Sequence, residues 1–239
     1  MNTDLYLSSS LRQIEARHSH EPLMQRAGAA AADWAAPLSS ERNQPILVLA
    51  GPGNNGGDAF EAARLLREQF FDVRLVFIAD PANLPKDAAA AYQRFKQAGG
   101  TTLSAIPDDS HWSLIIDGIF GIGLTRAPEG RYAEWIATAN RHASRDDCPL
   151  LALDCPSGLN ADSGQALGNT IIASHTITFI AGKPGLVTAE GPDHCGEIRI
   201  ASLDLTTDAD LPADGQIVSL ADFAAQLKPR QRNSHKGSF

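Results

Sequence analysis

The chain has 239 residues, of which 43% are apolar and 20% are charged, a balance typical of a folded globular protein. Its net charge of -8 argues against a nucleic acid or an anionic membrane as the main partner, although a few local donors can still hold a phosphate. The first twenty residues lack the apolar core of a signal peptide, and the most apolar stretches, such as 171–181, are too short to span a bilayer. The three cysteines show no metal-ligand spacing, so we predict a reduced, cytoplasmic protein.

Two helices are predicted first, over 11–18 and 22–36, and Pro37 is expected to end the second. After them, short apolar runs alternate with amphipathic segments. The apolar runs predict strands over 46–50, 73–78, 113–117, 150–153, 175–180 and 197–202. The amphipathic segments predict helices over 58–69, 86–97, 132–143 and 220–227.

Continuous apolar strands separated by helices are typical of a parallel sheet that is covered on both faces. The sequence therefore predicts an α/β fold, a three-layer α/β/α, Rossmann-like, doubly wound arrangement with a mostly parallel sheet. We expect the last two strands at one edge of that sheet. Residues 1–227 are predicted to form one domain, and the basic segment 228–239 is predicted to be a linker.

The turn after each strand is a candidate site, because ligands of open parallel sheets bind beyond the carboxyl ends of the strands. The first such turn, GPGNNGGD over 51–58, contains four glycines, which let the backbone approach a ligand closely. Asp58 is expected to cap the following helix, whose free N–H groups suit a phosphate or another anion. The alternative is a plain strand-to-helix connection.

The same turn also matches the G-x-G-x-x-G pattern of dinucleotide-binding dehydrogenases, through Gly51, Gly53 and Gly56. In that interpretation Asp80 would bind a ribose hydroxyl. Asp80 is followed by proline, however, and Asp-Pro often opens a turn, so a turn role is favoured. An NAD(P)-dependent oxidoreductase is therefore one alternative function, and a non-catalytic binding domain is another.

Two later turns add polar groups. DGIFGIGLTRA over 117–127 places Asp117 at a strand end, where it needs a partner, either a ligand or neighbouring backbone. DCPSG over 154–158 offers Asp154 and Ser157. A carboxylate at a strand end beside a glycine-rich pocket is a natural general acid or base, so Asp154 is the predicted catalytic residue.

Asn55, Asp117 and Ser157 are expected to converge from three strand ends. They offer oxygen ligands and one negative charge, which suits a weakly bound monovalent cation better than zinc. Lys183, in AGKPGL, either reaches a phosphate or has another role that the sequence leaves open. The seven histidines show no ligand spacing and are expected to be structural or exposed, and Cys155 is expected to pack in the interior.

Four motifs, GPGNNGGD, DGIFGIG, LALDCPSGL and ITFIAGKPGL, occur in this order after PLMQRAG. Together they closely resemble the YjeF N-terminal domain family, the NAD(P)H-hydrate epimerases, over about residues 10 to 227. The resemblance implies an isomerase, usually a homodimer, that interconverts the R and S forms of hydrated NADH and NADPH (NADHX and NADPHX) in nicotinamide cofactor repair. Residues 228–239 resemble the start of the ADP-dependent NAD(P)H-hydrate dehydratase domain that follows in many bacterial versions, which implies a bifunctional enzyme.

The resemblance also implies the site. The potassium ion of the family would be bound by Asn55, Asp117 and Ser157. The implied substrate contacts are Asn54, Asn55, Gly56, Gly57, Asp58, Gly121, Ile122, Gly123, Leu124, Thr125, Arg126, Ala127 and Asp154. The chain departs from the common family pattern at Gln25, Ala59, Ile122 and Cys155. Of these changes, Ile122 removes a hydroxyl that could contact a phosphate.

Overall fold

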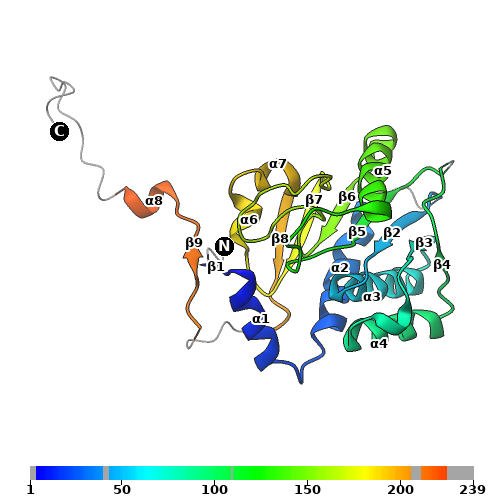
Figure 1. The fold of residues 1–239 in the computed structure, drawn as a ribbon, viewed down its shortest axis with the longest axis horizontal. Coiled ribbons are helices and arrows are strands. Elements are labelled where there is room, and N and C mark those ends of the chain that lie inside the picture. Colours follow the sequence, from blue (N-terminus) through cyan, green and yellow to red (C-terminus); the bar gives the residue numbers. More distant parts are fainter. Residues whose placement is uncertain (1–3, 40–42, 109, 206–210, 225–239) are drawn as a thin grey trace, which may run out of the picture.

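The structure is a computed structural model that describes residues 4–39, 43–108, 110–205 and 211–224. Within these ranges a seven-stranded sheet has the order β4-β3-β2-β5-β6-β7-β8, and every neighbouring pair is parallel (Figure 1). Its strands are β2 (Ile46–Ala50), β3 (Val73–Val76), β4 (Thr102–Leu103), β5 (Leu114–Gly118), β6 (Leu150–Leu153), β7 (His175–Phe179) and β8 (Glu197–Ala201). A separate antiparallel pair joins β1 (Asp4–Leu5) to β9 (Gly215–Gln216).

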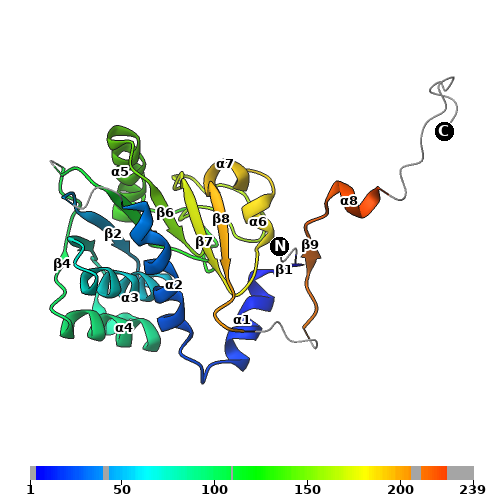
Figure 2. The ribbon, with the colours of Figure 1, turned by 180° about the vertical axis from the view of Figure 1, so that it is seen from behind.

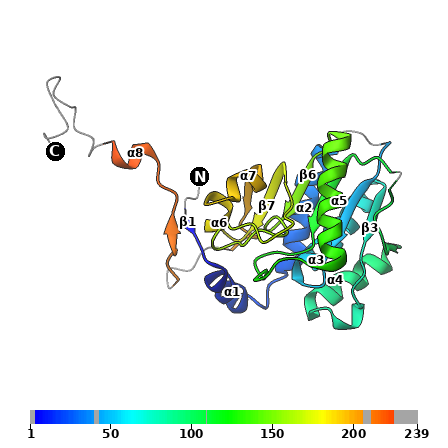
Figure 3. The ribbon, with the colours of Figure 1, turned by 45° about the horizontal axis from the view of Figure 1, so that its top comes forward.

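Helices cover both faces of the sheet, with α2, α3 and α4 on one side and α5 on the other (Figures 1 and 3). The described helices are α1 (Ser8–Arg17), α2 (Leu23–Leu38), η1 (Pro81–Asn83), α3 (Asn54–Glu68), α4 (Lys86–Gln97), α5 (Gly130–Asp146), α6 (Pro184–Val187), α7 (Gly191–Cys195) and α8 (Leu220–Phe223). The predicted three-layer, doubly wound α/β fold is confirmed. Seen from behind, β9 and α8 extend away from the layered body, beyond α1 (Figure 2).

The central strand β2 shows why an unbroken apolar run forms this fold. Successive side chains of a strand point to opposite faces. Ile46 and Val48 pack in the cluster formed with α2, α3 and α4, whereas Leu47 and Leu49 pack in the cluster formed with α5. All of β2 is fully buried. Because both faces are covered, no position in the strand has to be polar.

The order of the strands reverses at β2. From β2 the chain adds β3 and β4 on one side, and then returns to add β5, β6, β7 and β8 on the other. Such a switch point leaves a crevice between the two loops that diverge from it. In the register of the sheet, Leu49 of β2 pairs with Asp117 of β5, and Asp117 pairs with Ala152 of β6. Asp117 therefore lies at the carboxyl edge, beside the switch point.

Two predicted helix ends are wrong. Helix α3 begins at Asn54 with Gly53 as its N-cap, so Asp58 lies inside the helix and does not cap it. Gly56 and Gly57 serve close packing in the first turn: a Cβ on Gly56 would stand 2.0 Å from the carbonyl oxygen of Gly51, and one on Gly57 would stand 2.5 Å from Met24 Sδ. Pro37 does not end α2, which continues to Leu38 because a proline in the last turn costs only one backbone hydrogen bond.

Other boundaries agree with prediction to within a few residues, and β2, α4 and β6 agree at both ends; the predicted helix 220–227 begins at Leu220 as expected, and its predicted end lies outside the described residues. The short elements β1, β4, β9, η1, α6 and α7 were not predicted. In the parts of the chain that the structure describes, no helix is both long and apolar enough to cross a membrane. The proposed boundary at 227/228 and the segment 228–239 lie outside the described residues, so the predicted domain division stays a prediction.

Candidate active site

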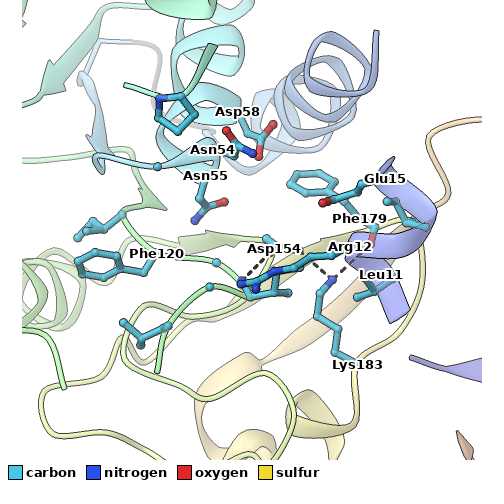
Figure 4. A pocket seen from close by; sticks show the side chains of 18 of the residues that line it. Leu11, Arg12, Glu15, Asn54, Asn55, Asp58, Phe120, Asp154, Phe179 and Lys183 are labelled. Atoms are coloured by element: carbon cyan, nitrogen blue, oxygen red, sulfur yellow. Dashed lines mark hydrogen bonds and ion pairs between the residues drawn. The ribbon is translucent and has the colours of Figure 1, made fainter. Parts of the chain in front are cut away.

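A cavity of about 380 Å³ opens at the carboxyl edge of the sheet, at the switch point (Figure 4). Loops after four strands form its walls, namely those that follow β2, β5, β6 and β7. Helix α1 closes one side with Leu11, Arg12 and Glu15. This lining confirms the prediction for the turns after β2, β5 and β6, whereas the turn 79–81 after β3, also a candidate, does not line the cavity.

Asp154 points into the cavity from the end of β6. Its Oδ1 is 2.8 Å from Lys183 Nζ, and its Oδ2 accepts the backbone N–H of Ile122 at 3.0 Å. The backbone of Asp154 has a φ of 66°, a left-handed conformation that is uncommon for residues with a Cβ. Its N–H donates to the carbonyl of Ile177 on β7, which fixes this turn. Both carboxylate oxygens are therefore held in place beside open space.

Lys183 is almost completely buried, with 1% of its surface exposed. Besides Asp154, its ammonium donates to Thr178 Oγ1 and to the carbonyl of Phe179. An ammonium has three N–H donors, and each has an acceptor here. Lys183 thus binds the candidate catalytic carboxylate and has no donor left for a phosphate, which settles the alternative that the sequence left open.

Asp117 and Ser157 are brought together as predicted. Asp117 is fully buried; its Oδ1 accepts the Ser157 hydroxyl at 2.6 Å and the N–H of Ile119 at 3.2 Å, while Oδ2 accepts the N–H of Ser157 at 2.8 Å. Burial raises the pKa of Asp117 to about 6, although these hydrogen bonds oppose the rise. Asp117 therefore also caps neighbouring backbone, the alternative role that the sequence offered.

Asn55 lies against the same strand end. Its backbone carbonyl oxygen is 3.1 Å from the position of a Cβ on Gly118, the residue that follows Asp117. The side chain lines the cavity and is only 7% exposed, yet neither its amide oxygen nor its amide nitrogen has a hydrogen-bond partner in the described structure. A buried amide without partners is rare and points to a ligand.

Of the three predicted cation ligands, Asn55 meets this test, whereas Asp117 and Ser157 are hydrogen-bonded to each other and to backbone, so that binding of a cation by all three stays a prediction. Asn55 offers an unpartnered amide oxygen, and Asp117 and Ser157 offer further oxygens at the adjoining strand ends. The described residues contain no group of three or more His, Cys, Asp or Glu side chains that could hold a metal ion. Oxygen donors of mixed type with one carboxylate are the set expected for potassium rather than for a transition metal.

Asp58 and Glu15 bring two further carboxyl groups to the cavity, from α3 and α1. Asp58 is 9% exposed, and Figure 4 draws no hydrogen bond or ion pair from it to the other cavity residues. Its pKa is raised well above the usual value by burial first, and then by the charges of Asp154, Glu15 and Glu61. Burial and then the charge of Asp154 also raise the pKa of Glu15, although part of its surface is exposed.

Several predicted substrate-binding residues line this cavity and others do not. The lining members are Asn54, Asn55, Asp58, Gly121, Ile122, Gly123, Leu124 and Asp154. The members outside the lining are Gly56, Gly57, Thr125, Arg126 and Ala127. The substrate contacts themselves stay predictions. A second cavity, of about 410 Å³, adjoins the first and shares Glu15, Asn54, Asp58, Phe179 and Ile180 with it.

Sequence reasoning missed the contribution of α1 and the Lys183–Asp154 pair. Three other expectations hold. Asp80 is a turn residue, whose carboxylate accepts the N–H of Ala82 at 2.9 Å. Buried His142 accepts the indole N–H of Trp112 and is structural. Cys155 is buried, and burial raises the pKa of its thiol, consistent with a packing role.

Comparisons with known proteins agree with this site. A family model described as YjeF-related protein N-terminus matches residues 20–185. The NAD(P)H-hydrate epimerase of Achromobacter xylosoxidans is 46% identical over 76% of this chain and 85% of that protein. The bifunctional NAD(P)H-hydrate repair enzyme Nnr of Escherichia coli is 40% identical over 80% of this chain and 37% of that protein.

The crystal structure of the yeast protein ynu0 has the same fold, with a TM-score of 0.64, 18% identity, and coverage of 79% of this chain and 85% of that one. The family model covers more than half of the chain, and the relatives exceed 40% identity over most of it. The chain therefore belongs to the YjeF-related protein N-terminus family.

Proposed function

We propose that this chain is an NAD(P)H-hydrate epimerase, which interconverts the R and S forms of NADHX and NADPHX. Relatives at 40 to 46% identity bear the name NAD(P)H-hydrate epimerase or bifunctional NAD(P)H-hydrate repair enzyme. One observation carries the proposal. The carboxylate of Asp154 is held in place through both of its oxygens, in a cavity at the switch point of a doubly wound sheet.

Epimerisation requires that the hydroxyl-bearing ring carbon loses its configuration and regains it from the other face. Departure of hydroxide and opening of the ring both achieve this, and both need a proton to move at the substrate oxygen. A single carboxyl group can serve either route: it donates the proton first when hydroxide departs and accepts it first when the ring opens, and it reverses the transfer afterwards. Asp154 is placed for this role, because it faces the cavity and Lys183 and Ile122 keep it oriented.

The rest of the substrate needs anion contacts. Helix α3 begins at Asn54 with 15 residues, so its free N–H groups and positive dipole end face the cavity where the glycine-rich turn ends. We assign the pyrophosphate and ribose to this turn and to the loop 121–127. A potassium ion bound by Asn55, Asp117 and Ser157 would supply positive charge that offsets these anions and would organise the turns.

The direct test is chiral chromatography of R-NADHX after incubation with the purified protein and potassium. The S form should appear faster than in a protein-free control. Asp154→Asn should fold normally and lose about a hundred-fold to ten-thousand-fold in rate, the usual contribution of a general acid-base group. A nearly unchanged rate in this variant would remove Asp154 as the catalyst.

The oxidoreductase alternative is disfavoured by Asp80, which caps the short helix η1 and does not line the cavity. Three further features stay predictions: a homodimer, fusion to an ADP-dependent dehydratase domain, and a cytoplasmic location. The fusion is supported by the bifunctional relatives, of which this chain spans about a third of the length.

A further inference from the structure

Lys183 approaches Asp154 from the turn after β7, on the side of the cavity opposite α3 (Figure 4). We propose that Lys183 is a positioning residue for the epimerisation: it holds Asp154 as an oriented carboxylate, so that the site begins each turnover with a base. The proposal rests on the proposed function. It assigns Lys183 no contact with the substrate, because each of its three donors already has an acceptor in the protein.

The burial of this pair sets it apart from an ordinary surface ion pair. Lys183 is 1% exposed and the side chain of Asp154 is 15% exposed, and their charged atoms are 2.8 Å apart. Burying an ammonium is costly unless its charge is paired and its protons are bonded. The buried ammonium of Lys183 is therefore stable only because Asp154, Thr178 and the carbonyl of Phe179 together accept its protons.

The backbone around Lys183 is fixed as firmly as its ammonium. The turn that precedes it contains Ile180 in a left-handed conformation, with a φ of 70°. The N-terminal segment then crosses this turn: Leu5 forms a bridge with Gly182, and the N–H of Tyr6 donates to the carbonyl of Gly182 at 2.9 Å. The turn that bears Lys183 is therefore held by backbone contacts with the N-terminal segment. The lysine cannot easily move with Asp154 if that residue is displaced.

The charges that face Asp154 explain why a fixed cation is needed. Arg12 and Glu15 approach from α1, Asp58 approaches from α3, and Lys183 approaches from the turn after β7. Burial and then the charge of Asp154 raise the pKa of both Glu15 and Asp58, so that charge reaches both groups. Without Lys183, three carboxyl groups would share one cavity, and Oδ1 of Asp154 would lose the cation that holds it.

The proton step is balanced within the site. In the ring-opening route, the ionised Asp154 takes the proton of the substrate hydroxyl and forms a new O–H bond. The electron pair of the broken O–H bond becomes the second bond of a carbonyl at the ring carbon, and the carbon–nitrogen bond of the ring breaks with its electron pair left on the nitrogen. Lys183 keeps all its protons throughout. The nitrogen then attacks the other face of the carbonyl carbon, the carbonyl electron pair returns to the oxygen, and Asp154 gives its proton back to that oxygen, so the site ends as it began.

The test measures kcat and KM against pH for the wild type, Lys183→Met and Lys183→Arg. Lys183→Met should lower kcat by about a hundred-fold, the lower end for a general base, with little change in KM. The acid limb of the kcat–pH profile of this variant should move to higher pH, because a carboxyl group without a neighbouring positive charge loses its proton only at a higher pH. Lys183→Arg keeps the charge and should retain more activity than Lys183→Met. Lys96→Met, on the exposed side of α4, controls for the loss of one positive charge.

A merely structural lysine predicts another result: equal losses for Met and Arg with an unshifted pH profile. That result, or an unchanged kcat in Lys183→Met, overturns the proposal. If Lys183→Met fails to fold, Thr178→Val is the deciding variant, because it removes one acceptor of the Lys183 ammonium. It should shift the acid limb of the pH profile in the same direction as Lys183→Met. An unshifted acid limb in a folded Thr178→Val overturns the proposal. An inactive wild type would instead contradict the proposed function itself.

Discussion

Gly121 lies directly against the carboxylate of Asp154, so that a Cβ on Gly121 would stand 2.5 Å from Oδ2. Gly121 does not have a left-handed backbone, so its conformation does not require glycine. The carboxylate cannot yield freely either, because Oδ2 accepts from Ile122 and Oδ1 binds Lys183. The need for glycine at this position therefore comes from the position of Asp154.

Gly121→Ala is expected to displace Asp154 and to lower kcat by about a hundred-fold, the cost of a misplacement of about 1 Å in a catalytic group. Folding should be preserved, because the three nearest atoms that the added methyl would meet all belong to the side chain of Asp154. Steady-state kinetics and a thermal melt would measure both. Gly215→Ala is the control, since a Cβ there has no atom within 4 Å. A wild-type kcat in Gly121→Ala would contradict the assigned position of Asp154.

Glu61→Ala should lower the free energy of unfolding without changing the catalytic groups. The side chain of Glu61 is fully buried in α3 and pairs with Arg64 at 3.0 Å and with Arg94 of α4. Removing one partner of a buried ion pair typically costs about 3 to 5 kcal/mol. Urea unfolding should show this loss, whereas Glu68→Ala, which breaks an exposed pair with Arg64, should cost at most about 1 kcal/mol. Equal losses in the two variants would refute this difference.

The sequence predicted the sheet and the place of the site well, for a physical reason. A strand that is buried on both faces is mostly apolar, so the unbroken apolar runs Ile46–Ala50 and Leu150–Leu153 have the predicted ends. The carboxyl ends of parallel strands share one edge, so the turns that follow them had to meet. Asp117, Asp154 and Ser157 could therefore be placed without coordinates.

What escaped prediction depends on contacts between distant segments. Arg12 and Glu15 enter the cavity because α1 packs against the switch point, and no local pattern in α1 records this. The NNGG segment forms helix because its glycines pack closely on Gly51 and on α2, whereas glycine after a strand normally indicates a turn. The pairing of Lys183 with Asp154 likewise required the geometry of two turns.

Potassium should stabilise the folded protein through Asn55. A ligand that binds only the folded state raises the melting temperature as its concentration rises. Thermal melts in potassium should therefore exceed those in tetramethylammonium, an ion too large for the site. Asn55→Ala should abolish most of this difference, because it removes the buried amide that has no protein partner. Asn83→Ala, in the exposed helix η1, should keep it. A wild-type melting temperature that is independent of the cation would refute the potassium assignment.

Asp58 should make stability fall as the pH rises. Burial, and then the charges of Asp154, Glu15 and Glu61, raise its pKa, so the folded protein binds this proton more tightly than the unfolded chain does. The stabilising effect of the bound proton is complete below the unfolded pKa of about 3.9 and is lost as the pH rises through the folded pKa. Asp58→Asn has no such proton to lose. Its melting temperature should therefore gain on that of the wild type as the pH rises from about 4 to 8, measured in tetramethylammonium buffers so that no potassium compensates the charge. Parallel curves over this range would show that Asp58 ionises in the folded protein as easily as in the unfolded chain.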